Sequence, residues 1–317
     1  MQVLRNVPLQ ATTPCVLTIG NFDGLHRGHQ ALLARLTAKA RSLGLPASVM
    51  TFEPHPRELF APDQAPARLT SLREKLRLLE SCGIDRVFVC HFNSRLAALE
   101  AEAFVERLLV QGLAVRHLYV GDDFQFGRGR RGHFALLQAA GAQHGFAVES
   151  MPTIDWQGER VSSSCIRDLL AEGELEHAAC LLGRTYSISG RVVHGQKIGR
   201  QLGFPTANVQ LKLKRAPLSG VFAVQVEGIA DQPLPGAASL GTRPTIADGL
   251  KPVLEVHLLD FERSIYGAHV RVNFLHKQRD EARFDTLDEL TAHIAQDVAA
   301  IRHYFNCFNY FQNVKNG

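Results

Sequence analysis

Residues 16–36 read VLTIGNFDGLHRGHQALLARL, and this stretch decides the fold of the first half of the chain. The apolar run VLTI at 16–19 predicts a short buried strand, and the leucines after residue 31 recur at helical spacing. We expect the helix to begin near His29. Such a helix directs free N–H groups and a positive dipole end toward the preceding loop, and phosphate is the natural ligand there.

The loop between this strand and this helix is rich in glycine and histidine. Gly20, Gly24 and Gly28 let the backbone approach a ligand closely. His26 and His29 can both donate hydrogen bonds to phosphate oxygens as charge develops in a transition state. Taken alone, an HxxH pair is more often a glycine turn with surface histidines, so the rest of the chain must decide.

Up to about residue 150, short β-rich runs alternate with helical patterns. The strand-like runs are VLTIG, ASVMTF, RVFVCHF, RHLYVG and FAVESM, and the helical ones include LREKLRLLE, AFVERLLV and FALLQAA. This alternation predicts a parallel sheet covered by helices on both faces, with ligands at the carboxyl ends of its strands. Residues 164–182 are expected to be helical in two pieces, broken at Gly173 and stopped at Gly183. We assign residues 1–184 to this α/β domain.

After Arg184 the pattern changes to alternation in steps of two. YSISGRVV, VFAVQVEG, VLEVHLLDF and HVRVNFLH are joined by Gly- and Pro-rich segments without helical patterns, which predicts an antiparallel barrel or sandwich. Apolar residues at spacings of three and four between Leu287 and Ile301 predict a closing amphipathic helix. This domain is expected to span residues 185–305, and the tail over 306–317 has no role that its sequence indicates.

Composition indicates a globular protein for small anionic molecules. With 45% hydrophobic and 21% charged residues the chain can form two cores, and a net charge of +4 is too small for most nucleic-acid binding proteins. The six cysteines form no CxxC pair and resemble neither a zinc site nor a disulfide framework, which favours a reduced, cytoplasmic setting. No stretch resembles a signal peptide or a membrane span, so we expect no membrane partner.

The segment VSSSCIR at 161–167 decides between the two interpretations of the histidines. HRGH at 26–29 resembles the HxGH signature of the nucleotidyltransferase superfamily, and VSSSCIR resembles its second signature, ISSTxIR. The resemblance implies that Ser163 and Ser164 hydrogen-bond phosphates and that Arg167 adds a fixed positive charge. Cys165 occupies a variable position of the signature, so we assign it no nucleophilic role.

Two further segments are candidates for the pocket of the phosphate acceptor. TFEPHPREL at 51–59 follows a strand, and Pro54 and Pro56 would stiffen it. GDDFQFGRGRRG at 121–132 also follows a strand and offers Asp123 as a polar partner and Phe126 as a flat surface for a planar ring. A solvated loop is an equally good interpretation of each. The RGRR run is more typical of a solvated or phosphate-facing loop than of an RNA contact.

The second domain opens with GRVVHGQKIGRQLGFPTANV, which combines glycines, cations and a rigid PTAN segment. Gly195 and Gly199, with Lys197 and Arg200, predict a flexible cationic loop.

Three oxygen-bearing side chains of this domain are candidates for chemistry. Thr206 and Asn208 are two residues apart, so on an extended segment their oxygens face one way, which suits a Mg²⁺ ion that bridges phosphates. Glu255 lies on a predicted strand between apolar neighbours, a suitable place for a general base. A coil-to-strand turn and a solvated strand carboxylate are the respective alternatives.

Together these motifs resemble the bacterial family that joins a flavin adenylyltransferase domain to a riboflavin kinase domain. TIGNFDGLHRGH, TFEPHP, GDDFQFG and VSSSCIR resemble the first domain, and GRVVHGQKIGRQLGFPTANV, SLGTRPTI, LEVHLLDFERSIYG and RDEARF resemble the second. The resemblance implies a Rossmann-like domain and a Greek-key barrel that convert riboflavin to FMN and FMN to FAD, with ATP as co-substrate and Mg²⁺. Ser239, where asparagine is usual, and the tail depart from the family pattern.

The resemblance also implies a role for each candidate residue. In the adenylyltransferase, His26 and His29 would be catalytic, and ATP would bind at Gly20, Asn21, Phe22, Gly28, Ser163, Ser164 and Arg167. The flavin there would contact Pro56, Asp123 and Phe126. In the kinase, Glu255 would be the base, Thr206 and Asn208 would hold the metal, and ATP would bind at Gly195, Lys197, Gly199 and Arg200. The flavin of the kinase would contact Arg279 and Glu281.

Two other functions remain open at this point. The first domain could adenylylate a different phosphate acceptor, as pantetheine-phosphate relatives do, although a flavin kinase in the same chain makes FMN the available acceptor. A degenerate transferase could instead serve as a flavin sensor or RNA binder, which the intact HRGH and SSSCIR motifs oppose. We expect small-molecule substrates, no nucleic acid, and a monomer or weak homo-oligomer.

Overall fold

The computed structural model describes residues 1–151, 155–156, 158–195, 198–245 and 249–315. The chain forms two compact units, one of Met1–Pro66 with Leu72–Ser163 and the other of Ala67–Ser71 with Ser164–Gly317. The units therefore divide about twenty residues before the expected boundary at 184, because α8 (Leu175–Leu182) packs against strand β14 (His269–Arg279) of the second unit. The boundary of the functional domains stays a prediction. None of the described helices has the length and apolar character needed to cross a bilayer.

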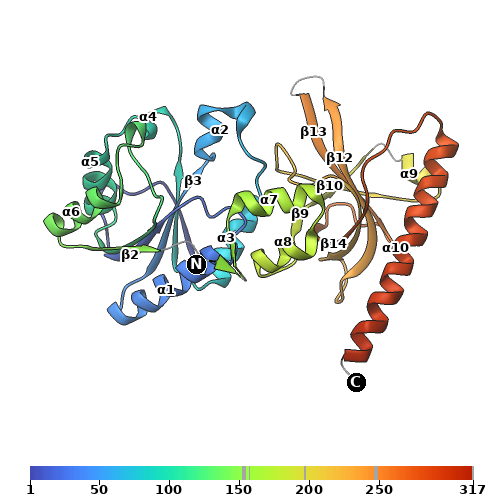
Figure 1. Cartoon of the computed structure of the whole chain (residues 1–317). Coiled ribbons are helices and arrows are strands. Elements are labelled where there is room, and N and C mark those ends of the chain that lie inside the picture. The colour runs from blue at the N-terminus through green and yellow to red at the C-terminus, as the bar shows by residue number, and fades with distance from the viewer. Residues whose placement is uncertain (152–154, 157, 196–197, 246–248, 316–317) are drawn as a thin grey trace. The chain divides into compact units, whose positions relative to one another are not determined.

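The first unit contains a parallel sheet, as predicted, with the strand order β1-β4-β3-β2-β5-β6 (Figure 1). Its strands are β1 (Gln2–Arg5), β2 (Cys15–Ile19), β3 (Ala47–Glu53), β4 (Arg86–His91), β5 (Val115–Gly121) and β6 (Ala147–Met151). The short strand β1 was not predicted, because four residues carry too little pattern; it pairs in parallel with β4. The hairpin of β7 (Asp155–Trp156) and β8 (Glu159–Arg160) follows the sheet.

Helices connect the strands of this unit. They are α1 (Arg27–Leu43), α2 (Pro56–Phe60), α3 (Leu72–Ser81), α4 (Ser94–Ala97), α5 (Ala101–Phe104) and α6 (Phe134–His144), with the 3₁₀ turns η1 (Pro62–Gln64) and η3 (Arg128–Arg130) and the π-helix η2 (Val105–Gly112).

The sheet is covered on both faces, because neighbouring residues of each buried strand point in opposite directions. Leu17 of β2 packs in a cluster with Leu109 of η2 and residues of α6, whereas Val16 packs in a second cluster with Leu33 of α1 and Leu79 of α3. The predicted two-sided α/β architecture is therefore confirmed.

The strand order places three of the predicted loops at one edge of the sheet. Strand β2 pairs with β3 on one side and with β5 on the other. Because all three strands are parallel, the loops that follow them leave the same edge, at the point where the chain changes direction across the sheet. The HRGH loop thus lies between the segments that begin TFEPHP and GDDFQFG.

The second unit contains a closed barrel with the order β10-β13-β12-β11-β14-β9 (Figure 1). Its strands are β9 (Ser187–Val193), β10 (Ala207–Gln210), β11 (Gly220–Glu227), β12 (Leu234–Thr245), β13 (Gly249–Leu258) and β14. Strands β11, β12 and β13 form successive antiparallel pairs and β14 returns beside β11, which is a Greek-key arrangement. Its helices are α7 (Ser163–Glu172), which begins on the last residue of the first unit, α8, α9 (Ile198–Gln201) and α10 (Leu287–Lys315).

Alternate residues of the barrel strands face the interior and α10. Phe222 is fully buried, whereas its neighbours Val221 and Ala223 pack in a cluster with Ile301 and Phe305 of α10. The predicted closing helix is confirmed, and it continues to Lys315 through most of the segment expected to be a separate tail.

Candidate active sites

The first candidate site is built on the loop between β2 and α1. The helix begins at Arg27, earlier than expected, because His26 is its N-cap and the His26 Nδ1 atom accepts a hydrogen bond from the His29 N–H at 3.4 Å. Gly24 takes a φ of +79°, and Phe22 and Leu25 take φ values of +48° and +42°, a conformation that costs energy in residues with a side chain. Strain of this kind concentrates at functional sites.

The two histidines of this loop form one stacked pair. Their ring centroids lie 3.7 Å apart with an interplanar angle of 18°. Burial lowers the pKa of His29 well below its ordinary value, and the nearby charges of His26 and Lys75 act in the same direction. His29 is therefore neutral near pH 7 and has one N–H to donate. Lys75 is a buried lysine that the sequence did not single out, since its helix α3 follows a different strand.

The other predicted residues of the loop support these rings. A Cβ at Gly28 would lie 3.2 Å from the His26 Nδ1 atom, and one at Gly20 would lie 3.1 Å from the Phe22 ring, so both positions favour glycine. The Phe22 ring is buried and lies 5.1 Å from the His29 ring, so this ring packs beside His29, and the expected contact of Phe22 with ATP stays a prediction. The carbonyl of Asn21 accepts a hydrogen bond from Thr51 at 3.4 Å.

The second signature reaches this loop through Ser163. The Ser163 hydroxyl donates a hydrogen bond of 2.9 Å to the backbone carbonyl of Asp23. Ser164 and Arg167 belong to the second unit, where the Arg167 Nε atom donates to the carbonyl of Ala67 at 2.6 Å. Their expected contacts with phosphates stay predictions.

The structure contradicts one residue that the sequence assigned to the acceptor pocket. Phe126 is buried and packs against Phe104 and Phe124, with ring centroids 5.1 and 5.6 Å away, so its ring presents no open surface to a ligand. The exposed aromatic ring lies elsewhere. Phe60, at the end of α2, is 68% exposed and makes an edge contact with Phe92 at 5.7 Å.

Pro56 and Asp123 lie in the segments that follow β3 and β5, and their contacts with the flavin stay predictions. Pro56 is the first residue of α2, which is capped by a reciprocal pair of hydrogen bonds between His55 and Glu58. Asp123 is exposed in the loop after β5. The arginines of the RGRR run are exposed, and Arg128 pairs with Glu100 at 3.2 Å.

The second candidate site is assembled by the register of the barrel. Asn208 of β10 lies directly opposite Glu255 of β13, and Glu255 lies directly opposite Ser239 of β12. Directly opposite residues of antiparallel strands share one face, so these polar side chains form a row across three strands. The sequence predicted the face of each residue, but not that Asn208 and Glu255 are neighbours.

The glycine loop of the barrel closes against the same row. A Cβ at Gly195 would lie 2.2 Å from the Asn208 Nδ2 atom, and one at Gly199 would lie 2.5 Å from the Phe204 carbonyl and 3.3 Å from the Thr206 hydroxyl. Lys197 lies outside the described residues. The expected loop is partly wrong, because Gly199 and Arg200 belong to the short helix α9; the Arg200 side chain is exposed.

Two residues of this row, together with Thr206 just before β10, carry oxygen atoms that suit a hard cation. Thr206, Asn208 and Glu255 offer hydroxyl, amide and carboxylate oxygens, the ligand types that Mg²⁺ prefers. No group of three or more His, Cys, Asp and Glu side chains that could hold a metal ion occurs among the described residues. An ion held by three protein oxygens would take its other ligands from water and phosphate.

An aromatic pair that the sequence did not reveal lies beside the glycine loop. The rings of His194 and Tyr266 lie with their centroids 4.0 Å apart and are tilted by 32° to each other. Two backbone hydrogen bonds, Gly267 N–H to Val192 carbonyl and Val192 N–H to Ala268 carbonyl, hold the two segments together. The two aromatic residues are more than seventy positions apart, so no local pattern could have paired them.

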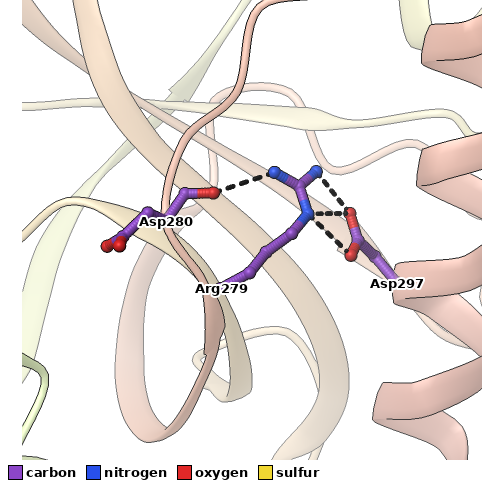
Figure 2. Close-up of polar contacts among 3 residues, drawn as sticks. All are labelled: Arg279, Asp280 and Asp297. Atoms are coloured by element: carbon purple, nitrogen blue, oxygen red, sulfur yellow. Dashed lines mark hydrogen bonds and ion pairs between the residues drawn. The ribbon is translucent and has the colours of Figure 1, made fainter.

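The expected flavin contacts of the kinase lie at the end of β14. The Arg279 Nε atom donates hydrogen bonds of 2.9 and 3.2 Å to the Asp297 carboxylate, and the guanidinium also donates to the Asp280 carbonyl at 2.9 Å (Figure 2). Arg279 thus ties β14 to α10. Burial raises the pKa of Glu281, while Arg279 and a backbone hydrogen bond at Thr242 oppose that rise. Flavin binding by either residue stays a prediction.

Comparisons with known proteins match both halves of the chain. The family model described as FAD synthetase matches residues 9–165, and the one described as riboflavin kinase matches residues 182–305. The chain is 52% identical to the bifunctional riboflavin kinase/FMN adenylyltransferase of Escherichia coli (strain K12), over 96% of this chain and 98% of that protein. It is 53% identical to the protein of the same description from Pseudomonas fluorescens, over 91% of this chain and 92% of that protein.

A solved structure covers both units. A crystal structure described as a macrolide-efflux protein from Streptococcus pneumoniae superposes with a TM-score of 0.79 and 29% sequence identity, over 95% of this chain and 99% of that chain. The chain therefore resembles known proteins in both sequence and fold over nearly its full length.

Proposed function

Because the chain belongs to the family of bifunctional riboflavin kinase/FMN adenylyltransferases, we propose that it phosphorylates riboflavin to FMN and then adenylylates FMN to FAD, with ATP in both steps. The observation that carries this proposal is that two family matches fall one after the other along the chain, over 9–165 and 182–305, and that each contains one of the two polar sites described above. The substrates are small molecules.

In the adenylyltransferase, the phosphate of FMN attacks the α-phosphorus of ATP and pyrophosphate leaves. The neutral His29 imidazole donates its N–H to phosphate oxygens, and His26 lies stacked beside it. The strained loop and the N-terminus of α1 hold the triphosphate in place, and the Ser163 hydroxyl is bonded to this loop through the Asp23 carbonyl. These groups stabilise charge and position the reactants, so no covalent intermediate is needed. The phosphate contacts of Ser164 and Arg167 stay predictions.

In the kinase, Glu255 accepts the proton of the ribityl 5′-hydroxyl as that oxygen attacks the γ-phosphorus of ATP. Its position opposite Asn208 supports this role, since a base must lie close to the groups that hold the phosphates. Thr206 and Asn208 would hold Mg²⁺, which neutralises charge on the phosphates when it is bound. Gly195 and Gly199 allow the phosphate loop to approach these two side chains closely.

Two aromatic groups are suited to planar rings of the substrates. The exposed pair His194 and Tyr266 lies at the glycine loop of the kinase, where it can stack the adenine of ATP. The exposed ring of Phe60, supported by Phe92, can stack the isoalloxazine of FMN in the adenylyltransferase. We propose Phe60 for this role in place of Phe126. A cytoplasmic setting, a monomer or weak homo-oligomer, and the absence of nucleic-acid partners stay predictions.

The test is to incubate the protein with riboflavin, ATP and Mg²⁺ and to separate FMN and FAD by chromatography. Both products are expected, and FMN supplied alone with ATP should yield FAD. Thr206→Ala should raise the Mg²⁺ concentration that FMN formation requires, because it removes one oxygen donor. If neither product forms, or if FMN is inert while another phosphate ester is adenylylated, the proposed function is wrong.

A further inference from the structure

Trp156 is the only tryptophan of the chain, and it lies against the HRGH motif. The guanidinium carbon of Arg27 lies 3.8 Å from the centroid of the Trp156 ring. Arg27 is the first residue of α1, between the two stacked histidines in sequence. Trp156 ends β7, the first strand of the hairpin that precedes the second signature.

The segment around Trp156 crosses the HRGH loop at two further points. We call residues 155–156 and 159–163 the strap. The Val161 carbonyl faces Gly28, where a Cβ would lie 3.8 Å away, and the Ser163 hydroxyl donates a hydrogen bond of 2.9 Å to the Asp23 carbonyl. The strap therefore contacts the loop before His26, at Asp23, and between the two histidines, at Arg27 and Gly28.

The chemistry of Arg27 explains why such a contact matters. His29 is neutral near pH 7 because burial lowers its pKa, so it supplies a hydrogen bond without a full charge. Arginine keeps its charge at all physiological pH values and binds phosphate oxygens through donors that lie in the plane of the guanidinium. A guanidinium carbon held 3.8 Å from the centre of an indole ring has a restricted position, which limits the directions in which its N–H donors can point.

We propose that Trp156 is a positioning residue that orients the Arg27 guanidinium toward the β- and γ-phosphates of ATP during FMN adenylylation. The inference rests on the proposed function of the first unit. Arg27 would contact these phosphates as soon as ATP binds, before the chemical step. Its orientation by Trp156 therefore affects ATP binding more than the transition state. Its loss should raise KM more than it lowers kcat.

The first experiment measures FAD formation from FMN and ATP in Trp156→Leu and Trp156→Phe. Trp156→Leu should raise the KM for ATP about 5-fold with kcat changed less than about 2-fold, as expected for loss of one partly desolvated cation–π contact. Trp156→Phe keeps an aromatic face and should recover most of the affinity. Phe261→Leu removes a ring that lies 5.2 Å from Arg263 in the barrel unit, and it should leave FAD formation unchanged.

A double-mutant cycle separates positioning from a merely structural role. Arg27→Met should raise the KM for ATP, and Trp156→Leu should add no further increase in that background. If Trp156 only stabilised the fold, Trp156→Leu would lower the melting temperature. It would also raise the KM for ATP by the same factor in the wild-type and Arg27→Met backgrounds. Riboflavin phosphorylation by the same variants should stay normal. This activity serves as the control that the chain is folded.

Trp156 fluorescence gives a readout that needs no variant of the tryptophan. Titration with ATP, without FMN, should change the emission of the wild-type protein, and Arg27→Met should lose that change. The inference is wrong if the wild-type protein forms FAD while Trp156→Leu keeps a normal KM for ATP, or if the emission does not respond to ATP. A wild-type protein that forms no FAD from FMN would instead overturn the proposed function.

Discussion

Replacement of Gly195 by alanine tests the kinase site where the glycine loop packs against Asn208. A Cβ there would lie 2.2, 2.4 and 2.5 Å from the Nδ2, Cγ and Oδ1 atoms of Asn208. All three distances are below any real Cβ contact, and they involve every atom of the planar amide, so no small rotation relieves them. The Gly195 φ lies outside the left-handed region, so the contact and not backbone strain opposes the alanine.

The size of the effect follows from the position of Asn208. Its amide lies opposite Glu255, where we propose that the phosphates and the base meet. A displaced amide removes one preorganised group from the transition state, which typically costs about 10²- to 10³-fold in kcat. Overpacking should also lower the free energy of unfolding by about 1–3 kcal/mol. FAD formation from supplied FMN should remain normal, because that site lies in the other unit.

The assay compares FMN formation, FAD formation and melting temperature in Gly195→Ala, Asn208→Ala and the double variant. In the double variant the new methyl group has room, so its melting temperature should equal that of Asn208→Ala and not fall further. Gly203→Ala is the matched control, because its Cβ would meet no atom within 4 Å and only its φ of +86° opposes the change. Normal FMN formation in Gly195→Ala, or additive loss of stability in the double variant, would refute the reasoning.

Three further predictions concern single side chains. His29→Asn should cut FAD formation by roughly 10²-fold. The pKa of His29 in the folded protein lies below its value in the unfolded chain. As pH falls through about 6.5, the unfolded chain therefore binds a proton that the folded protein does not, and the free energy of unfolding decreases. His29→Asn lacks this group, so its melting temperature should fall less between pH 8 and 5 than that of the wild-type protein. Glu255→Gln should slow riboflavin phosphorylation by about 10²- to 10⁴-fold and leave FMN adenylylation intact, and equal loss of both would make Glu255 structural. Asp297→Asn should lower the free energy of unfolding by about 2 kcal/mol, because it weakens the paired hydrogen bonds from Arg279. Arg302→Met removes an exposed ion pair with Asp260 and should change the melting temperature little. Equal effects of the two substitutions would contradict this prediction.

Much of the architecture of both units, and the candidate residues of their loops, could be predicted from local patterns in the chain. Apolar runs of four to six residues alternate with helical spacing in the first half, which predicted the parallel sheet. Steps of two follow in the second half, which predicted an antiparallel barrel or sandwich, and the family resemblance selected the barrel. The side of each strand was also predictable, because Glu255 and His257 alternate with Leu254 and Val256. HRGH and VSSSCIR together predicted phosphate chemistry, because the two motifs are recognised from local spacing and occur in the same domain.

The tertiary structure alone decided which side chains meet and which are exposed. Periodicity assigns a residue to a face but gives no register, so only the pairing of β10 with β13 brings Asn208 to Glu255. Exposure likewise depends on packing from distant elements, which buries Phe126 and leaves Phe60 open. The stacking of Trp156 on Arg27 joins residues 129 positions apart in sequence. A local pattern holds no information on such contacts, because they arise only when separate elements pack together.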